Sequence, residues 1–116
     1  MATVDRSFLL LVTSTEIGAG EQDLGSRLAE LLFGVLSQSD RIPGKIAFLN
    51  SGVFLTTEGS PIAEELKGME EQGTEICSCT TCLTYYDRME KLIVGRRSDM
   101  KDTVNALTSY QKVVTL

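Results

Sequence analysis

Residues 7–13 read Ser-Phe-Leu-Leu-Leu-Val-Thr, and this near-continuous apolar run decides the fold class of the chain. An uninterrupted apolar segment of this kind is typical of a central strand in a parallel sheet, because helices cover both faces of such a sheet. A strand with one face in solvent would alternate apolar with polar residues instead. We therefore expect an α/β protein with residues 7–13 inside its sheet.

The remainder of the chain alternates between helical and strand-like patterns. The turn Gly18-Ala-Gly20 leads into a segment whose apolar residues recur at helical spacing from Leu24 to Leu36. Further strands are expected at residues 45–50, 74–78, 92–94 and 112–116. Further helices are expected from Ser60 as N-cap and Pro61 to a left-handed C-cap at Gly73, over residues 81–89, and from an N-cap at Ser98 through Leu107. This alternation predicts a mostly parallel five-stranded sheet between layers of helices.

Length and composition set further bounds. With 116 residues, 42% of them hydrophobic, the chain is expected to form a single domain over residues 1–116. A formal net charge of −5 makes nucleic acid and anionic membranes poor partner candidates, because there is no basic surface for phosphate groups. The apolar run 8–12 is too short to span a membrane, and Asp5 stands where a signal peptide carries basic residues. We therefore expect a cytoplasmic protein.

All three cysteines lie in the segment Glu75-Ile-Cys-Ser-Cys-Thr-Thr-Cys-Leu-Thr-Tyr-Tyr86. In a reducing compartment, clustered cysteines serve metal binding or thiol chemistry more often than structural disulfides. A zinc or iron–sulfur site takes four soft ligands, whereas the chain offers three cysteines and no histidine. A metal site would need a fourth ligand from elsewhere, and we expect no metal and no other cofactor.

The pair Cys79-x-x-Cys82 has the spacing of thiol redox motifs, with the first cysteine before a helix and the second in its first turn. Backbone N–H groups at a helix start favour an anion, so we expect a lowered pKa for Cys79 or Cys82. Cys77 follows Ile76 inside the predicted strand, where a free cysteine most often serves as a small core residue.

Three polar turns, at residues 14–20, 50–52 and 78–82, are expected at the carboxyl edge of the sheet, where α/β proteins bind ligands. Hydroxyl and N–H groups there would donate hydrogen bonds to an anionic sulfur. The Gly18 turn is either an anion cradle or simply a tight strand-to-helix connection, and it lacks the spacing of a dinucleotide fingerprint. The candidate binding residues are Ser78, Thr80, Thr81, Gly18, Gly20, Asn50 and Tyr85.

Four segments resemble a known family: LLLVTSTEIGAGEQDLG, KIAFLNSGVFLTTEGS, GTEICSCTTCLTYY and LIVGRRSDM. From about Phe8 to the C-terminus, the chain resembles the DsrE-like domain of the sulfur-relay superfamily, and most closely the carboxy-terminal domain of YedF-type proteins linked to selenium metabolism. The resemblance implies a three-layer α/β/α domain of flavodoxin-like arrangement with a five-stranded parallel sheet. It also implies a persulfide on Cys79, with Cys82 as the second thiol, and assembly into homo- or hetero-oligomers, of which we expect a homo-oligomer here.

The leading hypothesis is a sulfur carrier, with selenium as a second candidate cargo. Cys79 accepts a sulfur atom from a donor persulfide, and Cys82 resolves or releases it, so the protein is reloaded rather than turning over as a classical enzyme. YedF-type proteins carry a TusA-like domain, so the expected partner is a sulfur-donor or acceptor protein of that kind. The alternative is a non-catalytic, oligomeric scaffold domain that docks such a partner and uses its thiols for redox sensing or packing. A third hypothesis is small-ligand binding at the Gly18 turn.

Overall fold

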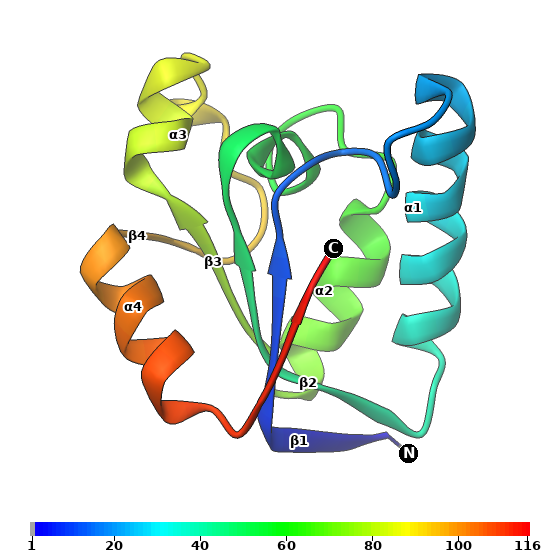
Figure 1. The fold of residues 1–116 in the computed structure, drawn as a ribbon, viewed down its shortest axis with the longest axis vertical. Helices are drawn as coiled ribbons and strands as arrows, with labels where there is room; N and C mark the ends of the chain where they lie inside the picture. Colours follow the sequence, from blue (N-terminus) through cyan, green and yellow to red (C-terminus); the bar gives the residue numbers. More distant parts are fainter. Residues whose placement is uncertain (1) are drawn as a thin grey trace.

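The computed structural model describes residues 2–116 as a five-stranded parallel sheet between layers of helices (Figure 1). The strand order is β4-β3-β2-β1-β5, which places the apolar strand β1 inside the sheet and confirms the predicted α/β class. Flavodoxin has the strand order 2-1-3-4-5, so this sheet shares the layered architecture of flavodoxin but not its strand order. The elements are β1 (Thr3–Val12), α1 (Gln22–Ser37), β2 (Arg41–Phe48), the 3-10 helix η1 (Asn50–Leu55), α2 (Ala63–Gln72), β3 (Glu75–Cys79), α3 (Thr80–Tyr85), the 3-10 helix η2 (Met89–Lys91), β4 (Arg96–Ser98), α4 (Met100–Ser109) and β5 (Lys112–Thr115).

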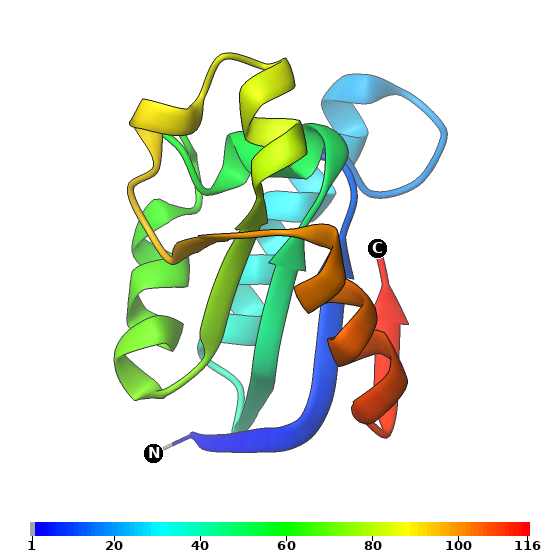
Figure 2. The same ribbon diagram turned by 90° about the vertical axis from the view of Figure 1, so that its left-hand side faces the viewer.

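The direction of winding sets which helices share a face of the sheet. Right-handed crossovers from β1 through β3 run one way across the sheet and place α1 and α2 on the same face. The chain then returns from β4 to β5 in the opposite direction, which places α4 on the other face (Figures 1 and 2). Within residues 2–116, no helix has the length and apolarity needed to cross a bilayer.

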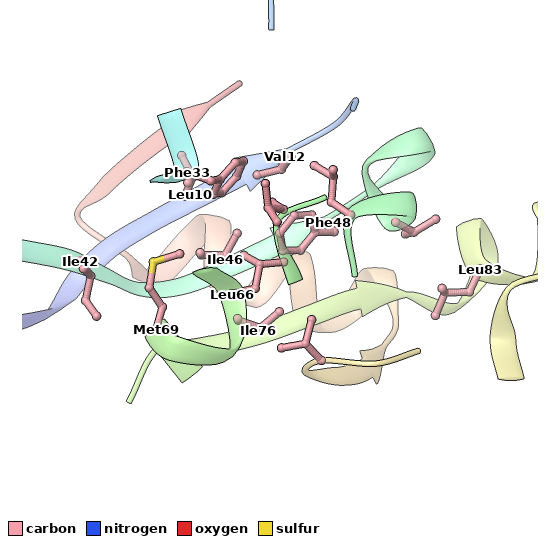
Figure 3. Packing of buried hydrophobic residues seen from close by; sticks show 14 residues of the cluster. Leu10, Val12, Phe33, Ile42, Ile46, Phe48, Leu66, Met69, Ile76 and Leu83 are labelled. Atoms are coloured by element: carbon pink, nitrogen blue, oxygen red, sulfur yellow. The ribbon is translucent and has the colours of Figure 1, made fainter. Parts of the chain in front are cut away.

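The main core lies between the sheet and the α1/α2 layer. Phe33 of α1 and Leu66 and Met69 of α2 pack toward sheet residues such as Ile46 and Ile76, and all five side chains are buried (Figure 3). Gly73 ends α2 with φ 119°, as its predicted left-handed cap requires.

The opposite face packs against α4 through a small apolar cluster and an ion pair. Its apolar cluster is small, consisting of Leu9, Ala47 and Ala106. Beside it the ammonium group of Lys45, which is only 4% exposed, contacts Asp102 Oδ2 of α4 at 2.8 Å. Lys45 stands in the strand predicted at 45–50, and nothing in its sequence context marks it as a buried cation, because the partner carboxylate comes 57 residues later.

Several predicted boundaries are wrong, including the end of the helix expected over residues 81–89, which stops at Tyr85. Residues 92–94 are not a strand: Leu92 forms an isolated antiparallel bridge with Thr57, and the edge strand β4 follows at Arg96–Ser98. An edge strand tolerates polar residues, so β4 lacks the apolar run by which the other strands are predicted. The cap of α4 is Asp99 rather than Ser98, since the Asp99 carboxylate accepts a hydrogen bond from the N–H of Asp102.

Helix α2 begins later than predicted, at Ala63 rather than at Pro61. The hydroxyl oxygen of Ser60 accepts a hydrogen bond from the N–H of Ile62 at 3.2 Å. The serine therefore closes a turn that precedes the helix, in a bond that competes with a conventional N-cap.

Candidate functional site

The thiol pair lies where β3 passes into α3. Cys79 is the last residue of β3, and Cys82 lies in the first turn of α3. Strand β2 pairs with β3 in parallel and ends at Phe48, after which η1 begins at Asn50. The two turns therefore meet at the carboxyl edge of the sheet, as the sequence predicted, and Figures 1 and 2 both show α3 beside η1 at this end.

A hydrogen bond joins these two turns. The backbone N–H of Asn50 donates to the Sγ of Cys82 at 3.0 Å. Asn50 has φ 51°, in the left-handed region that asparagine tolerates better than most residues. Two positions later, a Cβ on Gly52 would lie 2.5 Å from the carbonyl oxygen of Val12, so this turn packs against β1 too closely for a side chain. The donor is thus held rigidly by the main chain.

A shallow surface pocket of about 270 Å³ opens at Cys82. The hydroxyl of Tyr86 donates to Oδ1 of Asn50 at 3.0 Å, and the ring of Tyr86 packs edge-on against Phe54. Tyr85 is 82% exposed at the rim. The pocket is lined by Asn50, Thr81, Cys82, Tyr85 and Tyr86.

The two thiols of the pair differ in access. Cys79 is 2% exposed, whereas Cys82 is half-buried and lines the pocket, and both are free. Burial raises the pKa of Cys82, and the neighbouring Cys79 thiol raises it further, while the hydrogen bond from the Asn50 N–H acts in the opposite direction. The expected lowering of the pKa is therefore wrong for Cys82. Only six residues form α3, and burial raises the pKa of the Cys82 thiol by more than the backbone N–H donor lowers it.

Cys77 lies apart from this pocket. It sits in β3 with 1% exposure, and its thiol is 3.8 Å from a carboxylate oxygen of Glu75. Burial raises the pKa of Cys77 to about 11, against the opposing effect of nearby Lys45 and Arg96. In the part of the chain that the structure describes, no three histidine, cysteine or acidic side chains are arranged to hold a metal ion.

The remaining candidate residues are only partly brought together. Thr81 lines the pocket and Thr80 is half-buried at the start of α3, but the Ser78 hydroxyl is fully buried and shares a 2.6 Å hydrogen bond with Thr56. Alternate strand residues face opposite sides of a sheet, so Ser78 points away from Cys77 and Cys79.

Gly18 and Gly20 lie in the exposed turn before α1, on the far side of η1 from α3 (Figure 1). Gly18 has φ 86°, as a tight turn requires. The acidic residues Glu16, Glu21 and Asp23 flank this turn in the sequence, which disfavours a bound phosphate. The turn is thus explained as a strand-to-helix connection.

Tyr85 is the candidate binding residue from the sequence, but the spacing leaves open whether Tyr85 or Tyr86 faces the thiols, and Tyr86 is the tyrosine that contacts Asn50. Adjacent residues on a helix differ by about 100° in direction, and the sequence carries no signal that decides which of two tyrosines faces η1.

Solved structures with the same fold are known, whereas no family model and no curated protein matches the sequence. The ychN protein from E. coli is 18% identical with a TM-score of 0.66, over 97% of this chain and 100% of that chain. The protein of unknown function MTH1491 from Methanobacterium thermoautotrophicum is 12% identical with a TM-score of 0.67, over 97% and 100%. BT1422 from Bacteroides thetaiotaomicron, also of unknown function, is 14% identical with a TM-score of 0.61, over 95% of each chain. At these identities the likeness shows a shared fold, the DsrE-like fold that the sequence resemblance implied.

Proposed function

We propose that this chain carries sulfur as a persulfide on the Cys79–Cys82 pair, in the manner of the YedF-type branch of the DsrE-like superfamily, with selenium as a second candidate cargo. One observation carries the proposal: a thiol opens into a surface pocket, receives a main-chain hydrogen bond and lies near a second thiol. The cysteine-rich segment that resembles this family supplies the two thiols.

The pocket supplies one element that sulfur chemistry needs. Attack on a persulfide requires a thiolate, and the chain contains no histidine to act as its base. A rigid N–H aimed at the sulfur stabilises the anionic form relative to the same buried thiol without that donor. We place the protein in the cytoplasm, where thiols stay reduced, and propose a sulfur-donor or acceptor protein of the TusA-like kind as its partner.

Sulfur transfer from glutathione persulfide tests the proposal. The parent, the Cys77→Ser variant and the doubly substituted Cys79→Ser/Cys82→Ser variant are reduced, desalted and mixed with the donor. Transferred sulfur is counted as intact-mass gain plus free sulfide. We expect transfer by the parent and by Cys77→Ser, and none beyond the buffer rate by the double variant. Equal transfer by the double variant, or none by the parent, would refute the proposal.

A second observation favours the proposed homo-oligomer. Helix α1 carries a seam of Leu24, Leu28, Leu31 and Val35, which are 54%, 40%, 58% and 72% exposed. Their 4-3-4 spacing is that of a helix–helix contact. Three seam residues border an apolar groove of about 620 Å³, which is also lined by Phe8 and Leu10 of β1 and by Val114 and Leu116 at the C-terminal end of the chain.

We propose that a second copy of this chain fills the groove. The seam is a ridge beside a hollow, so two copies related by a twofold axis can each place the ridge in the other's hollow, which is the self-complementarity of an isologous dimer. The described residues that line the groove include no charged side chain. Two chains of formal charge −5 can therefore meet there without bringing like charges face to face.

Sedimentation analysis tests the assembly. Leu31→Glu places a charge in the seam, and Gln72→Glu adds the same charge on α2 outside the groove. We expect Leu31→Glu to be monomeric while the parent and Gln72→Glu form the oligomer. A monomeric parent, or an oligomer that survives Leu31→Glu, would show that this groove does not join copies of the chain.

A further inference from the structure

We infer that Cys82, and not Cys79, takes the sulfur atom from the donor, and that Cys79 then expels it as sulfide. This order reverses the roles that the family resemblance implies and rests on the proposed function. It follows from three features of the pair: the unequal access to its two thiols, the single N–H donor and the proximity of the two thiols.

Access separates the two thiols. A donor persulfide must bring its outer sulfur into bonding contact with the attacking thiolate. Cys79 is 2% exposed, whereas Cys82 lines the pocket beneath the rim residue Tyr85. A donor can therefore reach Cys82 in the conformation observed, while the buried Cys79 is closed to it in that conformation.

The hydrogen bond separates them in the same direction. The N–H of Asn50 is aimed at the Sγ of Cys82, and this donor lowers the pKa that burial raises. The bond favours the Cys82 thiolate, which is the form that attacks the donor. The accessible sulfur is thus also the one that the main chain prepares for negative charge.

The first step balances as a transfer without net oxidation. The Cys82 thiol gives its proton to solvent, and its thiolate attacks the outer sulfur of the donor R–S–SH. A sulfur–sulfur bond forms at Cys82 while the bond within the donor breaks. The electron pair of that bond leaves with the donor as R–S⁻, which takes up a proton. The protein now carries Cys82–S–SH.

The second step uses the buried neighbour. Cys79 and Cys82 lie one helical turn apart with neighbouring thiols, a separation that a disulfide can span. The Cys79 thiol loses its proton and attacks Sγ of Cys82, and the bond between Sγ and the outer sulfur breaks. The outer sulfur leaves as hydrosulfide with the electron pair, so it is reduced by two electrons while the two cysteines are oxidised to a disulfide. A dithiol reductant then restores both thiols.

Single substitutions test the order, with glutathione persulfide as the donor and no reductant present. We expect the parent to release about one equivalent of sulfide and to become lighter by two hydrogens. Cys79→Ser should gain one sulfur atom and retain it, with sulfide release lost. Cys82→Ser should take up sulfur at least about tenfold more slowly than the parent, because its two remaining thiols, Cys77 and Cys79, are both buried.

Two outcomes would overturn the order while leaving the carrier function standing: Cys82→Ser loading at the parent rate, or a loading parent beside a Cys79→Ser variant that takes up nothing. No uptake and no sulfide release by the parent would overturn both. Because Cys79 is buried, Cys79→Ala is run alongside, and thermal melting shows that each variant is folded. A carrier that loads through Cys82 gives the same retained sulfur in both Cys79 variants.

Discussion

The backbone N–H of Asn50 donates a hydrogen bond to the Sγ of Cys82 over 3.0 Å, between residues 32 positions apart in the sequence. The bond links the turn after β2 to the helix after β3. A main-chain donor of this kind survives every side-chain substitution that preserves the turn. The hydrogen bond to the Cys82 thiol, and its effect on the pKa of that thiol, therefore depend on the conformation of this turn.

The left-handed conformation of Asn50 predicts an unusual ranking of substitutions. Alanine pays a steric cost of about 1–2 kcal/mol at a positive φ, whereas glycine does not, and both lose the Tyr86 hydrogen bond equally. Asn50→Ala should therefore unfold at lower urea than Asn50→Gly, with a difference in unfolding free energy of about 1 kcal/mol. Equal stability would show that φ is not constrained here.

Even the smallest side chain at position 52 should destabilise the fold. A Cβ there would meet the carbonyl oxygen of Val12 at 2.5 Å, which the rigid strand cannot avoid. We expect Gly52→Ala to lower the unfolding free energy by about 2 kcal/mol. Gly68→Ala is the matched control, because a Cβ at this position in α2 meets nothing within 4 Å, and it should raise stability by about 0.5–1 kcal/mol. Losses of similar size in both variants would contradict the packing argument.

The raised pKa of Cys82 predicts its pH dependence. The thiolate is the reactive form, so alkylation of Cys82 by iodoacetamide should accelerate about tenfold per pH unit through neutral pH. Peptide mass spectrometry follows the modification, with free glutathione as the reference thiol. At pH 7 Cys82 should react more slowly than glutathione. A rate that levels off near neutral pH would mean that the Asn50 hydrogen bond outweighs burial.

Asp102 and Lys45 should make the protein sensitive to acid. The hydrogen bond from Lys45 holds the pKa of Asp102 below its usual value. The folded state therefore gains stability above the unfolded-state pKa of this carboxyl group and loses it as the pH falls through the folded-state pKa. Asp102→Asn should lower the unfolding free energy at neutral pH by about 2 kcal/mol, since it removes the charge paired with a buried ammonium group.

The control for this effect replaces both partners. In Lys45→Met/Asp102→Leu no buried charge remains unpaired, so the loss at neutral pH should be smaller than in Asp102→Asn. The dependence of stability on pH in the acid range should also be weaker than in the parent. Denaturant unfolding between about pH 3 and pH 7 measures both quantities. Identical acid profiles for the parent and the double variant would show that the pair does not couple stability to pH.

The sequence predicted the fold well because the buried parallel strands are apolar runs. The segments at 7–13, 45–50 and 74–78 each overlap an observed strand. The edge strand β4 reads Arg-Arg-Ser and has no such pattern, since its place is set by pairing with Cys77, Ser78 and Cys79. The apolar pattern of a local segment indicates that the segment is buried. Pairing at the edge of a sheet depends instead on residues elsewhere in the chain.

The site was less predictable than the fold. The alternation of strand side chains takes Ser78 to the core, where Thr56 is its partner, and this pairing depends on how η1 folds back over β3. The hydrogen bond from Asn50 to Cys82 involves only the main chain of Asn50, so residue identity carries no record of it. Which cysteine is buried depends on the position of α3, and spacing alone does not fix that.

The most direct measurement locates the transferred sulfur in the Cys79→Ser protein. After exposure to glutathione persulfide and alkylation with iodoacetamide, trypsin cleavage at Lys67 and Arg88 releases one peptide, residues 68–88, that contains every cysteine position. Fragmentation of that peptide then assigns the added sulfur. We predict it on Cys82, with Cys77 unmodified. Sulfur on Cys77, or no added sulfur on this peptide, would contradict the account.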